Sequence, residues 1–318
     1  MVESHGSLKL FAGNANPPLT AAISEVMGVP LAEMVVDRFC DGEIRVMIDE
    51  NARGTDAFVI QPTCGPVNDS LMELLIIIDA LRRASARRIT AVIPYYGYGR
   101  QDRKTRGREP ITAKMVANLI TTAGATRVLT IDLHAGQIQG FFDIPVDHLT
   151  GVPTLSAHFA KLDLGGEEVV VVAPDAGAVA RARDMAGRLG ARIAIVDKYR
   201  PLPGVSEVMN IIGDVRDKTA ILVDEMIDTA GTICAAACAL EQRGARRVLA
   251  GATHGILSPP AVERILTSPI EEMVLTDTVP LAGVAMESLR VLSVAPLLGR
   301  AIERIHEDRS VSELFVTG

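Results

Sequence analysis

Short aliphatic segments alternate with helical patterns along the whole chain, and this alternation restricts the possible folds more than any other feature. Strands are predicted at residues 8–12, 34–38, 43–48, 57–61, 89–94 and 127–131, and again at 169–173, 192–196, 219–224, 248–252, 273–276 and 290–294. Helical patterns lie at 17–27, 68–84, 112–122, 179–189, 232–243, 259–267 and 295–306. Such alternation favours parallel sheets covered on both faces. We therefore predict an α/β protein with two similar doubly wound parallel-sheet domains.

The length and the internal similarity of the chain agree with two domains. A chain of 318 residues fits two domains of about 150 residues each. Aromatic residues make up only 3% and Trp is absent, so the cores must be aliphatic. Residues 80–92 and 239–251 match as a helix end, a turn and a strand, which suggests a duplication. Gly and Pro residues after 147 place the boundary there, giving domains 1–149 and 150–318.

Charge and hydropathy exclude two classes of partner. The net charge of −7 argues against a basic nucleic-acid footprint, although local clusters of Lys and Arg can still bind a small polyanion. Residues 1–20 contain no apolar signal segment, and the apolar run 71–81 is too short to span a bilayer. We expect no nucleic-acid partner and no membrane partner.

The cysteines fit a reducing, cytoplasmic location. Their spacing contains no CxxC pattern and is too sparse for a disulfide framework. Two of them, one helical turn apart, are either half of a metal site or small buried residues on a helix. The four positions are Cys40, Cys64, Cys234 and Cys238.

The segment VDEMIDTAGT, residues 223–232, is the strongest single motif. Asp224 and Glu225 follow an apolar strand, at the edge where open α/β sheets place ligands. The loop 228–232 then opens a helix, so its amide groups and two Thr hydroxyls can bind a phosphate. The alternative is that Asp228 only caps the helix. A Walker pattern is absent and Gly97 and Gly99 lack the third glycine of a dinucleotide fingerprint, which excludes a P-loop kinase and a dehydrogenase.

Three further strand ends carry groups suited to a polyphosphate or a metal. The loop 94–104 is rich in Gly, Arg and Lys, and it is either a phosphate contact or a solvated surface. Asp132 and His134 should share one side of a strand end, where they can hold a Mg²⁺–nucleotide or serve as a cap and a core histidine. Asp175 follows another strand and is placed to bind a second Mg²⁺. Arg181 and Arg183, which begin the next helix, are expected to be solvated.

The last candidates for site residues are a pair of cations and a loop that lacks an acidic pair. Lys198 and Arg200 follow a strand, and Pro201, Pro203 and Gly204 indicate a loop beyond it. They are either surface charges or contacts for a polyphosphate. The loop 62–68 has the topological place of a phosphate loop but lacks an acidic pair. We therefore expect only the second domain to have this phosphate site.

The motif at 223–232 resembles the phosphoribosyl-binding signature of the phosphoribosyltransferase fold. Longer stretches extend the likeness to almost the whole chain, which resembles the bacterial ribose-phosphate diphosphokinase family, the phosphoribosyl diphosphate synthetases. These stretches are KLFAGNA (9–15), DGEIRV (41–46), VNDSLMELL (67–75), PYYGYGRQDRK (94–104), REPITAKMVANLITTAGATRVLTIDLHAGQIQGFFDIPVDHL (108–149) and VDEMIDTAGT (223–232).

The resemblance implies a role for each group of residues. Lys198 and Arg200 are the catalytic cations on a mobile loop, and His134 and Asp175 hold Mg²⁺. ATP is bound by Arg100, Gln101, Asp102 and His134 and, across a subunit interface, by Phe39, Asp41, Gly42 and Glu43. Ribose 5-phosphate is bound by Arg200, Asp224, Glu225, Asp228, Thr229, Ala230, Gly231 and Thr232.

The implied reaction transfers the β,γ-diphosphoryl group of ATP to the C1 hydroxyl of ribose 5-phosphate, giving phosphoribosyl diphosphate and AMP for nucleotide biosynthesis. The family also implies hexamers built from dimers, activation by phosphate and inhibition by ADP. Two alternatives are a phosphoribosyltransferase, which would consume the diphosphate, and a non-catalytic regulatory relative. The latter is disfavoured because His134, Lys198 and Arg200 are all present.

The chain departs from the family pattern at three positions. Gly99 replaces a common Ala, Ala178 replaces the second of two Gly, and Tyr199 stands where Arg is frequent. The first change is expected to be mild and the second puts the local turn in question. Downstream of His134, the resemblance links the stretch containing Asp143 and Asp147 with a phosphate- and metal-associated regulatory region.

Overall fold

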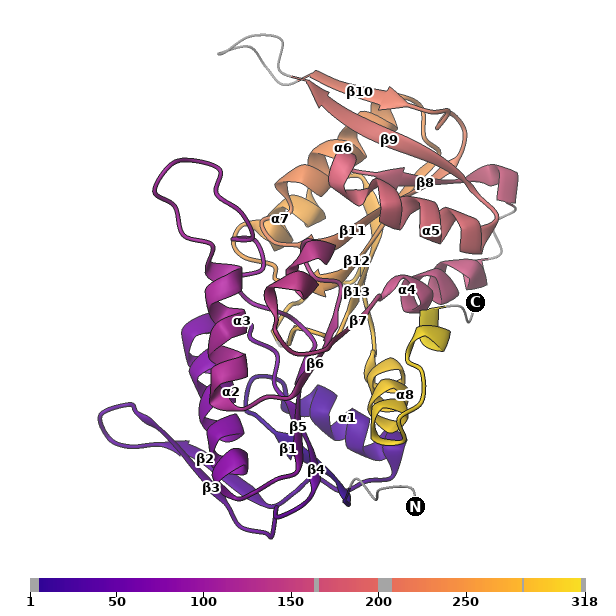
Figure 1. Ribbon diagram of the computed structural model, residues 1–318. Coiled ribbons are helices and arrows are strands. Elements are labelled where there is room, and N and C mark those ends of the chain that lie inside the picture. Colours follow the sequence, from indigo (N-terminus) through magenta and orange to yellow (C-terminus); the bar gives the residue numbers. More distant parts are fainter. Residues whose placement is uncertain (1–5, 163–165, 200–207, 282, 316–318) are drawn as a thin grey trace. The chain divides into compact units, whose positions relative to one another are not determined.

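The computed structural model describes residues 6–162, 166–199, 208–281 and 283–315, and its contacts divide the chain into two compact units (Figure 1). Unit 1 comprises the chain up to Thr150, Thr278–Pro280 and the segment from Ser293 on. Unit 2 comprises Gly151–Asp277 and Leu281–Leu292. Within the described residues, none of the helices is both long enough and apolar enough to cross a membrane.

Unit 1 is built on a sheet of five strands that all run parallel. Their order is β1 (Leu8–Ala12), β4 (Asp56–Ile60), β5 (Arg88–Ile93), β6 (Arg127–Ile131) and β7 (Val146–Leu149). The helices of this unit are α1 (Pro17–Met27), α2 (Val67–Arg83), α3 (Thr112–Ala123) and α8 (Ala295–His306).

Alternate residues of these strands enter two different cores. Ala57 and Val59 pack in the core that contains residues of α2 and α3, whereas Phe58 and Ile60 pack in the core that contains residues of α1 and α8. All four side chains are fully buried. Because successive strand residues point to opposite faces, the helices cover both faces of the sheet, which confirms the predicted architecture.

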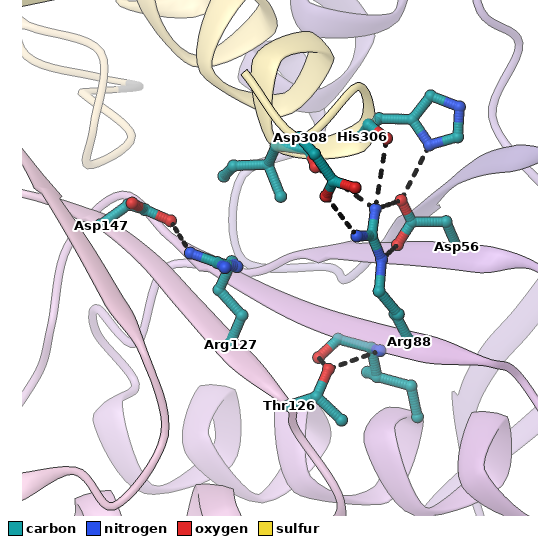
Figure 2. A network of polar contacts seen from close by, with 9 residues as sticks. Asp56, Arg88, Thr126, Arg127, Asp147, His306 and Asp308 are labelled. Carbon is teal, nitrogen blue, oxygen red and sulfur yellow. Dashed lines mark hydrogen bonds and ion pairs between the residues drawn. The ribbon is translucent and has the colours of Figure 1, made fainter. Parts of the chain in front are cut away.

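The C-terminal helix α8 packs with unit 1, whereas the sequence-based division assigned it to the second domain. Its apolar stripe, including Leu298 and Ile302, completes the core that α1 shares with the sheet. At the last residue of the helix, His306 Nδ1 lies 2.8 Å from Asp56, and just beyond it Asp308 pairs with Arg88 at 3.0 Å (Figure 2). The helix therefore supplies the cover that one sheet face lacks.

A separate two-stranded antiparallel hairpin, β2 (Met34–Arg38) and β3 (Ile44–Ile48), extends from unit 1. Val36 and Val46, which pair with each other, pack against the core beneath α2. Figure 1 shows the hairpin as an arm that ends in an open turn.

Unit 2 is built on a seven-stranded sheet in which only the outermost strand on one side is antiparallel. The order is β10 (Val208–Ile212), β9 (Arg192–Tyr199), β8 (Val169–Ala173), β11 (Thr219–Ile227), β12 (Arg247–Gly255), β13 (Ile270–Thr276) and β14 (Leu289–Leu292). The helices are α4 (Val152–Phe159), α5 (Val179–Leu189), α6 (Gly231–Gln242) and α7 (Ala261–Leu266). Short 3₁₀ turns lie at Ala160–Leu162, Gly166–Glu168 and Ala176–Ala178 in this unit, and at Gly136–Phe141 and Ser312–Phe315 in unit 1.

The same alternation occurs in unit 2. Ile221 and Val223 of β11 pack with α4 and α5, whereas Ala220 and Leu222 pack with α6 and α7. The described part of the chain thus contains two α/β units with parallel sheets, the fold class predicted from the sequence.

The two matching segments at 80–92 and 239–251 have the same backbone conformation. Each ends a helix with a residue of positive φ, Ser85 at 63° and Gly244 at 86°. Their carbonyl oxygens accept equivalent hydrogen bonds, from Gly54 at 2.9 Å and from Asp217 at 2.8 Å. A parallel strand follows in both cases, as predicted.

Three elements were not predicted. β7 and α4 lie on either side of the predicted domain boundary, in a stretch whose Gly and Pro content gave no strand or helix pattern. In α4 the proline, Pro153, occupies the first turn, where no internal hydrogen bond is lost. The third element, β10, is the antiparallel edge strand of unit 2.

Candidate active site

The acidic pair lies within β11 rather than after it. The strand was predicted to end at Asp224, but pairing with β12 continues to Ile227. On its other side, pairing with β8 stops at Leu222. Asp224 and Glu225 therefore extend past the last rung shared with β8, on a strand still supported by β12.

Arg181 of α5 neutralises part of this acidic charge. Its Nη1 lies 3.0 Å from Glu225 Oε2 and 3.8 Å from Asp224 Oδ1. Burial, together with the neighbouring Glu225, raises the pKa of Asp224 to about 8, while Arg181 acts in the opposite direction. Two carboxylates and one guanidinium form a compact polar cluster with donors and acceptors for a sugar.

The expectation that Arg181 is solvated is wrong. Its side chain is only 14% exposed, and its buried Nε has no hydrogen-bond partner among the described residues. The helical period would have revealed the inward position, since Ala182 and Met185 mark the buried face of α5. Arg183 is exposed, as expected.

The loop 228–232 joins β11 to α6 and has an open helix N-terminus. The cap residue is Ala230, in the left-handed conformation with φ of 58°, and no side chain caps the helix. The interpretation of Asp228 as a simple cap is therefore wrong. Within the described chain, no hydrogen bond takes the amide groups of Ala230, Gly231 and Thr232. These groups are available to an anion, which the helix dipole also favours.

Asp175 lies at the end of β8, the neighbour of β11. Its Oδ1 accepts hydrogen bonds from the amides of Gly177 at 2.9 Å and Ala178 at 3.3 Å. Ala178 has φ of −84° and is buried, so its methyl group fits both the turn and the core. This departure from the family pattern leaves the turn intact.

Lys198, one of the two candidate cations, lies on β9, next to the edge strand β10 and on the opposite side of the sheet from β14. Lys198 is the penultimate residue of β9, where it pairs with Met209 of β10, so the strand extends beyond the predicted end at 196. Tyr199 ends the strand and pairs with Val208. Arg200 and the rest of the predicted loop, 200–207, lie outside the described residues.

In unit 1, the segment after β5 and the segment after β6 lie together. A Cβ atom on Gly99 would stand 3.6 Å from His134 Cβ and 3.1 Å from the Tyr96 carbonyl oxygen. An Ala side chain at this position would therefore require the Tyr96 carbonyl to move by a few tenths of an ångström, and the mild effect of Gly99 stays a prediction. Gln101 contacts the start of α3, because Thr112 Oγ1 donates to its side-chain oxygen at 2.5 Å and the Ala113 amide donates to its backbone carbonyl at 3.1 Å. Arg100 and Gln101 are exposed, and Asp102 is half-buried.

The expected alternation of Asp132 and His134 is interrupted. β6 ends at Ile131, and Asp132 has a positive φ of 38°. Asp132 is buried while His134 is exposed, so the two do not repeat along an extended strand. His134 alone of the two is open to a ligand.

The hairpin turn at 39–43 is well defined and exposed. The amide of Phe39 donates to the Glu43 carbonyl at 2.9 Å, and Gly42 has a positive φ of 95°. Asp41 Oδ1 accepts from the Glu43 amide at 3.1 Å. The Phe39 ring is 52% exposed, and Arg45 lies over it at 5.6 Å. Figure 1 shows this turn apart from the segment that follows β5, so the two do not form one site within a single unit 1.

Asp147 has a structural partner. It pairs with Arg127 of the adjacent strand at 2.6 Å and is only 18% exposed (Figure 2). Asp143 is 82% exposed, with its carboxylate 3.8 Å from Lys114. Among the described residues, no three His, Cys, Asp or Glu side chains form a metal cluster.

The comparisons with known proteins agree along the chain. The family model for the N-terminal domain of ribose phosphate pyrophosphokinase matches residues 8–124, and the phosphoribosyl synthetase-associated domain matches residues 198–316. The ribose-phosphate pyrophosphokinase of Clostridium tetani is 59% identical over 99% of both chains, and that of Bacillus subtilis is 57% identical over 97% of both.

A solved structure gives the same result. The phosphoribosylpyrophosphate synthetase of Mycobacterium smegmatis is 45% identical, with a TM-score of 0.89 over 95% of this chain and 99% of the other. The identities, coverage and shared fold together show that the chain belongs to the ribose-phosphate pyrophosphokinase family.

Proposed function

We propose that the protein transfers the β,γ-diphosphoryl group of ATP to the C1 hydroxyl of ribose 5-phosphate, releasing phosphoribosyl diphosphate and AMP for nucleotide biosynthesis. This proposal rests on the site between β11 and α6 in a chain that belongs to the ribose-phosphate pyrophosphokinase family. There, a buried acidic pair with an Arg181 counter-charge precedes an uncapped helix N-terminus.

The ribose 5-phosphate occupies this site. The amides of Ala230, Gly231 and Thr232 bind its phosphate. The hydroxyls of Thr229 and Thr232 also bind it, and Asp228 is the first residue of this binding loop. Asp224 and Glu225 accept hydrogen bonds from the ribose hydroxyls. Such bonds to ionised groups are about twice as strong as neutral ones.

ATP is bound by two sets of residues from unit 1. One set is Arg100, Gln101, Asp102 and His134, supported by the close approach of Gly99 to His134. The other set is Phe39, Asp41, Gly42 and Glu43 of a neighbouring subunit. The exposed position of these four residues at the end of an arm supports this arrangement.

Mg²⁺ fits the donors that the chain offers. It prefers oxygen ligands, keeps several waters and takes only one or two carboxylates beside substrate phosphates. Asp175 provides such a carboxylate, with one oxygen fixed by two amides. His134 lies by the nucleotide phosphates. When bound, the ion neutralises the developing polyphosphate charge.

The chemistry then depends on position and charge. The C1 hydroxyl attacks the β-phosphorus in line, and no covalent enzyme intermediate is needed. Lys198 and Arg200 stabilise charge on the transferring group, and Arg200 also contacts ribose 5-phosphate. Closure of their loop excludes water.

The assembly and regulation follow the family pattern. The protein is a cytoplasmic homo-oligomer, a hexamer built from dimers, in which phosphate activates and ADP inhibits.

A coupled assay for AMP tests the function. With ATP, Mg²⁺ and ribose 5-phosphate, AMP should form only when all three are present. Consumption of phosphoribosyl diphosphate with a nucleobase would indicate a phosphoribosyltransferase instead. Absence of AMP from the folded oligomer would indicate a non-catalytic relative.

A further inference from the structure

Arg264 of α7 reaches the loop that precedes α6. Its Nη1 donates a hydrogen bond to the carbonyl oxygen of Thr229 at 2.9 Å, although the two residues are 35 positions apart. A Cβ atom on Gly231 would stand 3.4 Å from the same nitrogen. The guanidinium therefore lies against both the loop and the first residue of the helix.

The hydrogen bond fixes the orientation of one peptide group. A trans peptide is planar, and its carbonyl and amide point in opposite directions. Holding the Thr229 oxygen on the Arg264 side therefore directs the Ala230 amide to the other side of the loop. Ala230 adopts the left-handed conformation, which is costly for a residue with a Cβ atom. An external hydrogen bond helps to hold that conformation.

The backbone beneath Arg264 is itself fixed relative to α6. Its neighbours Ala261 and Ile265 are buried in the same core as Ile233 and Ala237 of α6. The guanidinium side chain is exposed and forms one wall of a groove with Cys234, Cys238, Thr267 and Ser268. Arg264 thus has a backbone fixed by the core and a guanidinium group in a surface groove. This combination suits a residue that positions a neighbouring loop.

We infer that Arg264 is a positioning residue for ribose 5-phosphate binding: it holds the Thr229–Ala230 peptide so that the Ala230 amide faces the 5-phosphate. This inference rests on the proposed function, in which the loop 228–232 binds that phosphate. Arg264 acts through Thr229, and its charge adds to the positive potential at the start of α6.

The test compares three substitutions by steady-state kinetics for both substrates. Arg264→Met removes the hydrogen bond and the charge, Arg264→Lys keeps the charge, and Thr232→Val removes a hydroxyl of the loop itself. Arg246→Met is the matched control, because Arg246 of the same unit pairs with Glu168 at 3.0 Å on the surface. Thermal unfolding checks that each variant is folded.

Arg264→Met should raise the KM for ribose 5-phosphate by about tenfold, with little change in the KM for ATP or in the unfolding temperature. Arg264→Lys should recover part of that loss, and Arg246→Met should match the parent. A normal KM in Arg264→Met beside a raised KM in Thr232→Val would overturn the role of Arg264 and leave the proposed function standing.

Two further outcomes are also decisive. Equal losses for both substrates with a lowered unfolding temperature, not recovered by Arg264→Lys, would show a purely structural role and overturn the inference. A normal KM for ribose 5-phosphate in both Thr232→Val and Arg264→Met would overturn the binding loop and the inference together.

Discussion

The side chains of Asp224, Glu225 and Arg181 form a charged cluster at the site that we propose for ribose 5-phosphate. Burial favours the neutral form of Asp224, and Glu225 disfavours a second negative charge beside it. Arg181 offsets both effects only in part. The pKa of Asp224 is therefore held above its ordinary value in the free protein.

The raised pKa of Asp224 predicts that the kcat/KM for ribose 5-phosphate depends on pH. The pKa of Asp224 is raised to about 8, so the carboxylate that we propose as acceptor for the ribose hydroxyls accumulates only as pH rises through that value. The kcat/KM for ribose 5-phosphate should increase between pH 7 and pH 9. Arg181→Met removes the one lowering charge and should move the inflection to higher pH. An inflection unchanged by this substitution would contradict the assignment.

Sequence reasoning reached the residues of the loop but not those that support it. Asp224, Glu225 and the loop 228–232 follow a recognisable strand and carry their own motif. Arg181 and Arg264 lie 43 residues before Asp224 and 35 after Thr229, and their contacts depend on helix packing. The helical period of α5 indicates that Arg181 faces inward, but the residues that Arg181 and Arg264 contact are a property of the tertiary structure.

Among the elements, strand positions were predicted more accurately than strand ends. Runs such as 169–173 and 220–223 are buried and aliphatic, so hydropathy locates them. β11 and β9 extend further, over polar residues, because β12 and β10 provide hydrogen-bond partners. An isolated sequence segment contains no information about the length of its neighbour.

The position of Lys198 on β9, paired with β10, supports a prediction about catalysis. Lys198→Ala should lower kcat by about 10²–10³-fold and change the KM for ATP much less, because its proposed interaction strengthens in the transition state. Stability should change by only about 0.5 kcal/mol. Single-turnover and steady-state rates measure the effect. A near-normal kcat would remove Lys198 from the catalytic machinery.

The docking of α8 gives a prediction about stability. Asp56 is fully buried and accepts two hydrogen bonds from Arg88, one of them at 3.0 Å, as well as contacting His306 (Figure 2). Asp56→Ala leaves the guanidinium without this carboxylate and should destabilise the protein by about 3 kcal/mol. Urea unfolding measures the loss.

The control for this change is an exposed ion pair. Glu271→Ala removes the partner of Arg247, and both side chains are at least 40% exposed. Its effect should stay within about 0.5 kcal/mol. Equal losses in the two variants would contradict the proposed importance of the Asp56 network.

For the whole molecule, the position of the 39–43 turn predicts dependence on assembly. If this turn completes a neighbour's ATP site, an Asp41→Ala/Glu43→Ala variant and a Lys198→Ala variant should each be nearly inactive. Mixing them under conditions of subunit exchange should restore part of the activity through hybrid sites. Activity that remains at the level of the separate variants would contradict a shared site.

The division of the chain into two compact units could be predicted from the sequence only in part. The alternation of strands and helices indicated two α/β units. The return of α8 to unit 1 could not be read from its sequence, since an amphipathic helix fits any open apolar sheet face.

The measurement that tests the central claim most directly follows the β-phosphorus of ATP. With ATP labelled at that phosphorus and ribose 5-phosphate, label should leave the nucleotide and appear in phosphoribosyl diphosphate, in a one-to-one ratio with unlabelled AMP. Label retained in ADP would show transfer of a single phosphoryl group, and label released as free diphosphate would show hydrolysis. Either result would contradict diphosphoryl transfer at this site.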